Sequence, residues 1–221
     1  MKYIAKNQKL KHNNEINDNI RKENKEFNKQ WIANNKLIGE GIVLVDELDV
    51  SSEVKLDASS FMVVWLKNIE RLCEMFSSEF DYKSFSLLDI GCGSGISTFF
   101  FHQKYDFDRC DGFDFSSSLI GLANKNKKII NRDGVDTSSI SFNFADAKKI
   151  KLQDKRYALF MFNPFGWETM NEFISNNIEV LQKNNSVILY ANDICVGNLL
   201  VFGRMVKRDD FFNLSVIAFG D

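Results

Sequence analysis

Ser86-Leu87-Leu88-Asp89-Ile90-Gly91-Cys92-Gly93-Ser94-Gly95-Ile96 is the stretch of sequence that decides the fold. Its first half is a short apolar run, which predicts a buried strand over residues 86–91. The three glycines let the chain turn sharply and leave no Cβ between the backbone and a ligand. Apolar residues then resume and predict a helix over 95–104, whose first turn presents free N–H groups. A strand, a bare loop and a helix N-terminus form the general plan of a nucleotide-binding site.

The spacing of the glycines excludes two common kinds of nucleotide site. A dinucleotide fingerprint has glycine at its first, third and sixth positions, but the sixth position counted from Gly91 is Ile96. No Lys followed by Ser or Thr comes after the last glycine, so the loop is not a P-loop. The glycines fall instead at Gly91, Gly93 and Gly95, with Asp89 two residues upstream. The loop alone therefore does not identify the ligand, which has to be inferred from other parts of the chain.

A second predicted strand, over residues 110–114, ends in an acid. Asp114 lies 23 residues after Gly91, which in a βαβ unit places its carboxylate beside the glycine loop. A carboxylate there can accept hydrogen bonds from both hydroxyls of a ribose. The alternative is that Asp114 caps the following helix, but Ser116 already fills that role. We therefore favour Asp114 as a ligand-binding residue.

The third and fourth predicted strands also end in polar residues. Residues 140–144 alternate in polarity and lead into Asp146, for which a surface turn is the alternative. Residues 157–162 are nearly all apolar, as in a strand buried on both faces of a parallel sheet. They lead into Asn163 and Pro164, the only proline in the chain. Because proline disfavours the helical region for the residue before it, we expect an extended Asn163 at the carboxyl edge of the sheet.

The remaining pattern alternates helices and strands. Helices are expected over about 57–76, 116–128, 168–182 and 193–198, a strand over 186–190, and a hairpin that pairs 199–207 with 211–219. This order predicts an α/β fold with a mostly parallel sheet, helices on both faces and a C-terminal antiparallel hairpin.

The glycine loop and the three acids, each at the end of its own strand, resemble motifs I, II and III of the class I S-adenosylmethionine-dependent methyltransferases. The resemblance implies a seven-stranded Rossmann-like sheet with S-adenosyl-L-methionine as cofactor. It implies that the loop lies against the methionine part, that Asp89 organises the site around the amino group, and that Asp146 faces the adenine amino group. The cofactor-binding residues that it implies are Asp89, Gly91, Cys92, Gly93, Gly95, Asp114, Phe115, Asp146, Ala147 and Asn163.

Asn163-Pro164-Phe165 resembles motif IV of the amino-methylating members, which read Asn or Asp, Pro, Pro, aromatic. The resemblance implies three catalytic residues: the Asn163 oxygen and the Pro164 carbonyl accept hydrogen bonds from the target amine, and Phe165 forms the pocket wall. This chain has one proline where that motif has two, so its aromatic residue comes one place early. The form Phe-Asn-Pro-Phe-Gly is nearer to small uncharacterised bacterial methyltransferases, whose chains resemble this one from about residue 37 to the end.

The net charge of −2 hides an asymmetry. Residues 1–36 carry nine Lys or Arg against four Asp or Glu, a net of +5, which leaves −7 for the rest. Ile16, Ile20, Phe27 and Trp31 have helical spacing there and predict one amphipathic helix. This basic arm could act as a lid or bind a nucleic acid or protein partner, with a solvated helix face as the alternative. We therefore divide the chain into 1–56, an N-terminal helical arm or lid plus connecting segment, and 57–221, the methyltransferase domain.

Composition narrows the function further. The chain has no run of 18 apolar residues and no apolar signal-peptide core, and its four cysteines are scattered, so we expect a cytoplasmic protein with no membrane association. Only two histidines are present, and the metal-binding acid of catechol-type enzymes is replaced by Asn163, so no metal is expected. The expected function is methyl transfer to an N or O of a small-molecule or saccharide-like acceptor. The alternatives are N-methylation of a nucleic acid or protein amine, and an inactive cofactor-binding partner module.

Overall fold

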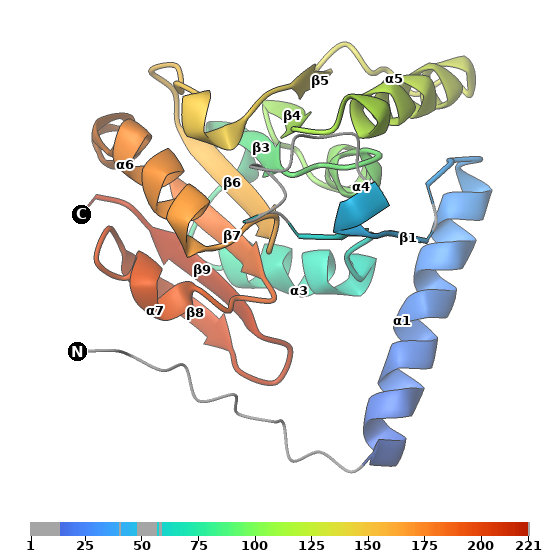
Figure 1. Cartoon of the computed structure of the whole chain (residues 1–221), viewed down its shortest axis with the longest axis horizontal. Helices are drawn as coiled ribbons and strands as arrows, with labels where there is room; N and C mark the ends of the chain where they lie inside the picture. The colour runs from blue at the N-terminus through green and yellow to red at the C-terminus, as the bar shows by residue number, and fades with distance from the viewer. Residues whose placement is uncertain (1–13, 40, 48–56, 58, 221) are drawn as a thin grey trace.

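The computed structural model describes residues 14–39, 41–47, 57 and 59–220 (Figure 1). The segment 46–55 is rich in acids and is expected from its sequence to form a loop; most of it lies outside these residues. In chain order the elements are α1 (Asn14–Asn34), β1 (Ile42–Val43), the 3-10 turn η1 (Val45–Glu47), β2 (Phe61–Met62), α3 (Leu66–Ser77), η2 (Tyr82–Ser84), β3 (Ser86–Ile90), α4 (Ile96–Lys104), β4 (Arg109–Asp114), α5 (Ser117–Arg132), β5 (Ile140–Phe144), η3 (Ala147–Lys149), β6 (Tyr157–Phe162), α6 (Trp167–Lys183), β7 (Val187–Ala191), α7 (Val196–Leu199), β8 (Arg204–Asp209) and β9 (Leu214–Ala218).

A seven-stranded sheet forms the centre, in the order β5-β4-β3-β6-β7-β9-β8. The five strands from β5 to β7 in this order are parallel, and β9 and β8 complete the sheet as an antiparallel hairpin. The predicted mostly parallel Rossmann-like fold with a terminal hairpin is therefore confirmed. The strand order reverses between β3 and β6, and ligands bind such sheets at the carboxyl ends of the strands beside that point.

Two apolar layers cover the sheet because successive side chains of a strand point to opposite faces. Along β6, Ala158 and Phe160 pack with α3, α4 and α5, whereas Leu159 and Met161 pack with α6 and α7. Figure 1 shows α6 and α7 together on one side and α1 along the far edge of the molecule. The sheet is thus buried on both faces, which fixes the carboxyl edge as the place where a ligand can enter.

The predicted helix over 57–76 begins later than expected, and this prediction was wrong at its start. Helix α3 begins at Leu66, and residues Phe61 and Met62 instead form a short strand that pairs with β1. Asp57 does not cap α3. Its carboxylate accepts the N–H of Thr169 at 2.9 Å, in the first turn of α6. The first N–H groups of α6 have no partner within the helix, so the Asp57 carboxylate binds there and not at α3.

The predicted N-terminal helix is α1, and it is attached to the core by polar as well as apolar residues. Phe27 and Trp31 make edge contacts with Phe100, at centroid distances of 6.3 and 5.2 Å. Asn24 lies in the gap between Ile20 and Phe27 of the apolar pattern, and both it and Asn28 are buried. Asn28 donates to the Val64 carbonyl at 2.8 Å and accepts the Leu66 N–H at 2.9 Å. One amide therefore ties α1 to the segment that joins β2 to α3.

Replacing Asn28 with alanine should lower the free energy of unfolding by about 2–4 kcal/mol, because a buried carbonyl and a buried N–H lose their partners. Urea unfolding measures the change. Gln30→Ala is the matched control, since Gln30 is exposed on the same helix and its amide donates only to Glu26. Equal stability of the two variants would contradict this account of how α1 is held.

Among the helices of the described residues, none combines the length and the apolar character needed to span a bilayer.

Candidate functional site

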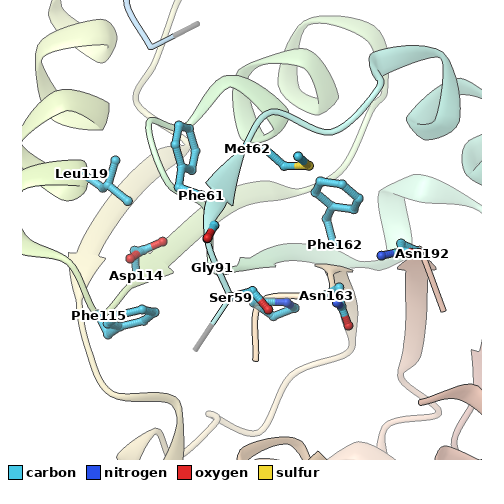
Figure 2. A pocket seen from close by; sticks show the side chains of 12 residues that line it. Ser59, Phe61, Met62, Gly91, Asp114, Phe115, Leu119, Phe162, Asn163 and Asn192 are labelled. Carbon is cyan, nitrogen blue, oxygen red and sulfur yellow. The ribbon is translucent and has the colours of Figure 1, made fainter. Parts of the chain in front are cut away.

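A cleft lies at the carboxyl ends of β3, β4, β6 and β7, with a volume of about 120 Å³ (Figure 2). Figure 2 shows Asp114 and Phe115 on one side of Gly91, and Asn163 and Asn192 on the other. The lining residues are Ser59, Ser60, Phe61, Met62, Gly91, Asp114, Phe115, Leu119, Phe162, Asn163, Pro164 and Asn192. Five of the residues singled out from the sequence are therefore brought to one place: Gly91, Asp114, Phe115, Asn163 and Pro164.

The glycine loop has the backbone that its sequence predicts. Gly91, Gly93 and Gly95 have φ values of 75°, 54° and 79°, in the left-handed region that favours glycine. A Cβ at Gly91 would lie 2.5 Å from the Pro164 Cβ, and one at Gly93 would lie 2.0 Å from the Phe61 ring. The loop thus depends on glycine for both its conformation and its close contacts.

Asp114 joins the glycine loop to the end of β4. Its carboxylate is buried and accepts the N–H of Gly93 at 2.9 Å and the N–H of Ser116 at 2.9 Å. Ser116 caps α5 by accepting the Leu119 N–H, as predicted. These two bonds fix the orientation of the Asp114 carboxylate at the wall of the cleft.

Asp89 lies behind the loop, in a narrow crevice beside the cleft that Cys92 also lines. Its carboxylate is buried and accepts the hydroxyls of Ser97 at 2.5 Å and Thr98 at 2.7 Å. Burial raises the pKa of Asp89 to about 6, although these hydroxyl bonds lower it. Asp89 therefore ties β3 to the first turn of α4 on the inner side of the loop.

The buried Asp89 should make stability fall with rising pH. Its folded-state pKa of about 6 lies above the ordinary 3.8, so the folded state binds more protons in that window. A difference of this size corresponds to about 3 kcal/mol. Asp89→Asn keeps acceptors for both hydroxyls but does not titrate. The stability of the wild type relative to this variant should therefore fall by about 2 kcal/mol between about pH 4.5 and 7.5.

Urea unfolding across that pH range measures the difference between the two proteins. Asp106→Asn is the matched control, because Asp106 is exposed and makes only a 3.8 Å ion pair with Lys83. Its stability relative to the wild type should stay within about 0.5 kcal/mol at every pH. A flat difference for Asp89→Asn as well would refute the proton-binding role of the buried acid.

Strand β2 lies across the glycine loop and separates the cleft from the crevice. Phe61, Met62, Gly91 and Phe162 line both the cleft on the Asp114 side and the crevice on the other. Ligand pockets usually measure about 300–1,000 Å³, so the cleft is small because the Phe61 ring packs on the loop. A nucleoside-sized ligand that spans both spaces requires Phe61 to move aside.

Asn163 is not extended, and this prediction was wrong. Its φ is 49°, in the left-handed region, which asparagine visits more readily than most residues. Its Oδ1 accepts the hydroxyl of Tyr190 at 3.5 Å, and the Pro164 carbonyl accepts the backbone N–H of Ser59 at 3.2 Å. A residue before proline prefers an extended conformation. Asn163 instead adopts the left-handed one, in a turn that is contacted by β7 and by the segment before β2. Such a conformation costs about 1–3 kcal/mol and is found preferentially at functional sites.

The structure also adds residues that sequence reasoning did not place in the site. Asn192 follows β7 with a φ of 55° and lines the cleft beside Asn163. Ser59, Phe61 and Met62 come from the segment that was expected to be helical. An asparagine directly after a buried strand was a usable signal for Asn192. The two-residue strand β2 gives no periodic pattern, so nothing in the sequence marks Phe61.

Five other singled-out residues line neither the cleft nor the crevice, and Gly93 of the loop is one of them. Asp146 caps η3 by accepting the Lys148 N–H at 3.0 Å, and Ala147 is buried in the α6 layer. Phe165 is also buried in that layer. Gly95 is the residue before α4, where a Cβ would meet the Phe142 ring at 2.6 Å. None of these residues forms part of the lining of the cleft or the crevice in this structure.

Comparison with known proteins gives the class of this domain. Residues 87–184, which include the glycine loop, Asp114 and Asn163, match the family model described as "Methyltransferase domain". This part of the chain is an S-adenosylmethionine-dependent methyltransferase domain, and S-adenosyl-L-methionine is its cofactor. A search of curated proteins gives no significant match to the chain.

The chain is also similar in fold to several solved structures. The ribosomal protein L11 methylase of Lactobacillus delbrueckii subsp. bulgaricus has 12% identity and a TM-score of 0.48, over 69% of this chain and 77% of that one. Thermoplasma acidophilum 1320 has 17% identity and a TM-score of 0.45, over 69% and 86%. CalS10, an amino pentose methyltransferase from Micromonospora echinaspora, has 15% identity and a TM-score of 0.41, over 57% and 49%. The chain thus spans about half the length of CalS10.

The residues present fit the cofactor. Gly91 and Gly93 offer backbone without side chains beside the cleft, and Asp114 places a carboxylate, the kind of acceptor that ribose hydroxyls bind, on its wall. The loop leads into the N-terminus of α4, as in other nucleotide-type sites.

Proposed function

We propose that the protein transfers the methyl group of S-adenosyl-L-methionine to an N or O of a small-molecule or saccharide-like acceptor. The observation that carries the proposal is that one cleft holds Gly91 and Asp114 together with Asn163 and Asn192. The first pair belongs to the match with the methyltransferase family, and the second pair offers amide donors and acceptors to a second ligand.

The walls of the cleft support a small acceptor. Met62, Phe115 and Phe162 present apolar surface, while the two asparagine amides provide hydrogen bonds of both kinds. A sugar-like or amino-sugar-like molecule has this same mixture of apolar faces and hydroxyl or amino groups.

The residues of the cleft act by positioning. When bound, the cofactor supplies a methyl group on a positively charged sulfur. Asn163 and Asn192 orient the acceptor, and Phe61 and Met62 exclude water from the reacting atoms; such alignment supplies up to about 7–11 kcal/mol of a barrier. Asp114 is the only ionisable side chain among the described residues that line the cleft. This supports a neutral amine as nucleophile ahead of a hydroxyl, whose proton needs a base.

A methyl-transfer screen tests the proposal. The protein is incubated with S-adenosylmethionine labelled at the methyl group and a panel of amino sugars, sugars and small amines, and labelled products are separated by size. Label on a small molecule is the expected result. Label only on nucleic acid or protein would establish the alternative acceptor class. Binding of S-adenosylhomocysteine without any transfer would instead identify an inactive cofactor-binding module.

A further inference from the structure

A second hollow lies between α1 and the β1–β2 pair and has a volume of about 770 Å³. Its floor includes Ile32, Val63 and Trp65, and one wall is the face of α1 that carries Arg21, Lys22, Lys25 and Lys29. We call this hollow the α1 groove. Its volume lies within the range of small-molecule sites, about 300–1,000 Å³.

The charged wall of the α1 groove is predominantly positive. Residues three or four apart lie on one face of a helix, which places Lys22, Lys25 and Lys29 in one row. Arg21 is 3.9 Å from Asp18, but these three lysines form no ion pair with any of the described residues. All three are exposed. Asp18 and Glu26 line the same groove, so its charged lining holds four positive and two negative side chains, a net of +2 beside an apolar floor.

The α1 groove and the cleft share one lining residue. Met62 lines both of them, and Figure 2 shows its side chain beside Phe162 of the cleft. Asn28 holds α1 against the chain two residues beyond Met62, through its bond to the Val64 carbonyl. A ligand that extends past Met62 thus contacts the lysine row at one end and the asparagines at the other.

We propose that the α1 groove binds the anionic part of the acceptor, a phosphate or carboxylate group on a small molecule, while the atom to be methylated enters the cleft past Met62. This inference rests on the proposed function. The apolar floor of Ile32, Val63 and Trp65 favours a small molecule with an apolar part over a polyanion. The net charge of −7 on residues 37–221 also disfavours a polyanion, because it repels an extended nucleic acid.

Calorimetric titration with inorganic pyrophosphate tests the inference, because this probe carries the anion and needs no methyl transfer. Three proteins are compared: the wild type, the variant Lys22→Gln/Lys25→Gln/Lys29→Gln, and a matched control, Lys125→Gln/Lys128→Gln/Lys155→Gln. The control lysines are exposed and lie outside the groove and the cleft. Loss of the row should weaken pyrophosphate binding at least about tenfold, and the control should change it less than about twofold.

S-adenosylhomocysteine is titrated into the same three proteins, and its affinity should be the same in all. Loss of that binding would count against the proposed function, whereas intact binding with no pyrophosphate effect would overturn only the groove. Citrate in place of pyrophosphate distinguishes a carboxylate-bearing from a phosphate-bearing acceptor. Tighter binding of a 20-nucleotide oligo-dT than of pyrophosphate, lost in the groove variant, would overturn the small-molecule assignment in favour of nucleic acid.

Discussion

Asp114→Ala should lower the affinity for S-adenosylhomocysteine at least about 100-fold, the largest effect on binding expected of any single substitution here. Two hydrogen bonds from ribose hydroxyls to an ionised carboxylate are worth about 1.5–3 kcal/mol each, and 100-fold corresponds to about 2.7 kcal/mol. The same change removes the acceptor of the Gly93 and Ser116 N–H groups, so the glycine loop also loses its support. Calorimetry measures the affinity, and we expect a loss of about 2–4 kcal/mol in unfolding free energy beside it.

Two further variants separate the loss of cofactor contacts from the loss of folding stability. Asp114→Asn retains one acceptor oxygen and should show an intermediate affinity while folding more stably than the alanine variant. Asp111→Ala removes an acid of the same strand that contacts Arg109 and Ser141 outside the cleft. Its affinity for the homocysteine product should equal that of the wild type. Wild-type affinity in Asp114→Ala would show that the cofactor does not bind at the end of β4.

Asn163→Ala should lower kcat for the acceptor found in the screen by at least about 100-fold, while the affinity for S-adenosylhomocysteine changes less than about threefold. The amide holds the acceptor in position, and a misplacement of the reacting atoms by about 1 Å can lower the rate about 100-fold. Alanine also introduces strain, because the φ of residue 163 is 49°. Asn163→Gly removes the amide without that strain and should lose as much turnover as alanine does.

The matched control is Asn185→Gly, which makes the same exchange at a φ of 48° outside the cleft. This variant should retain full turnover. Recovery of turnover in Asn163→Gly would mean that backbone strain, and not the amide, explains the alanine result. Unchanged turnover in both variants at position 163 would remove Asn163 from the catalytic site.

The fold was predictable because its information is local and repeated. Each buried strand is a short apolar run. Strand β4 ends at Asp114, β3 ends one residue after Asp89, and β6 ends one residue before Asn163. Carboxyl ends of parallel strands meet at one edge, so Gly91, Asp114 and Asn163 had to come together once the strand order was right. The buried pair Asn24 and Asn28 escaped the same reasoning, because an apolar pattern does not register asparagines that satisfy backbone groups.

The parts of the site that escaped prediction depend on contacts between distant segments. Phe61 reaches Gly93 only because β2 pairs with β1, and neither two-residue strand has a periodic signature. The φ of Asn163 opposes the preference of a residue before proline, and its surroundings are supplied by Tyr190 and Ser59. Met62 belongs to the cleft and to the α1 groove through the packing of α1, which no local pattern encodes.

Thermal unfolding with S-adenosylhomocysteine, with NAD as the control ligand, tests the central claim most directly. At 100 times its dissociation constant a ligand of the native state stabilises it by about 2.7 kcal/mol, which is a shift of several degrees for a chain of this size. We expect this shift with S-adenosylhomocysteine and none with NAD. No shift with S-adenosylhomocysteine, or an equal shift with NAD, would contradict the assignment of the cleft to the methyl donor.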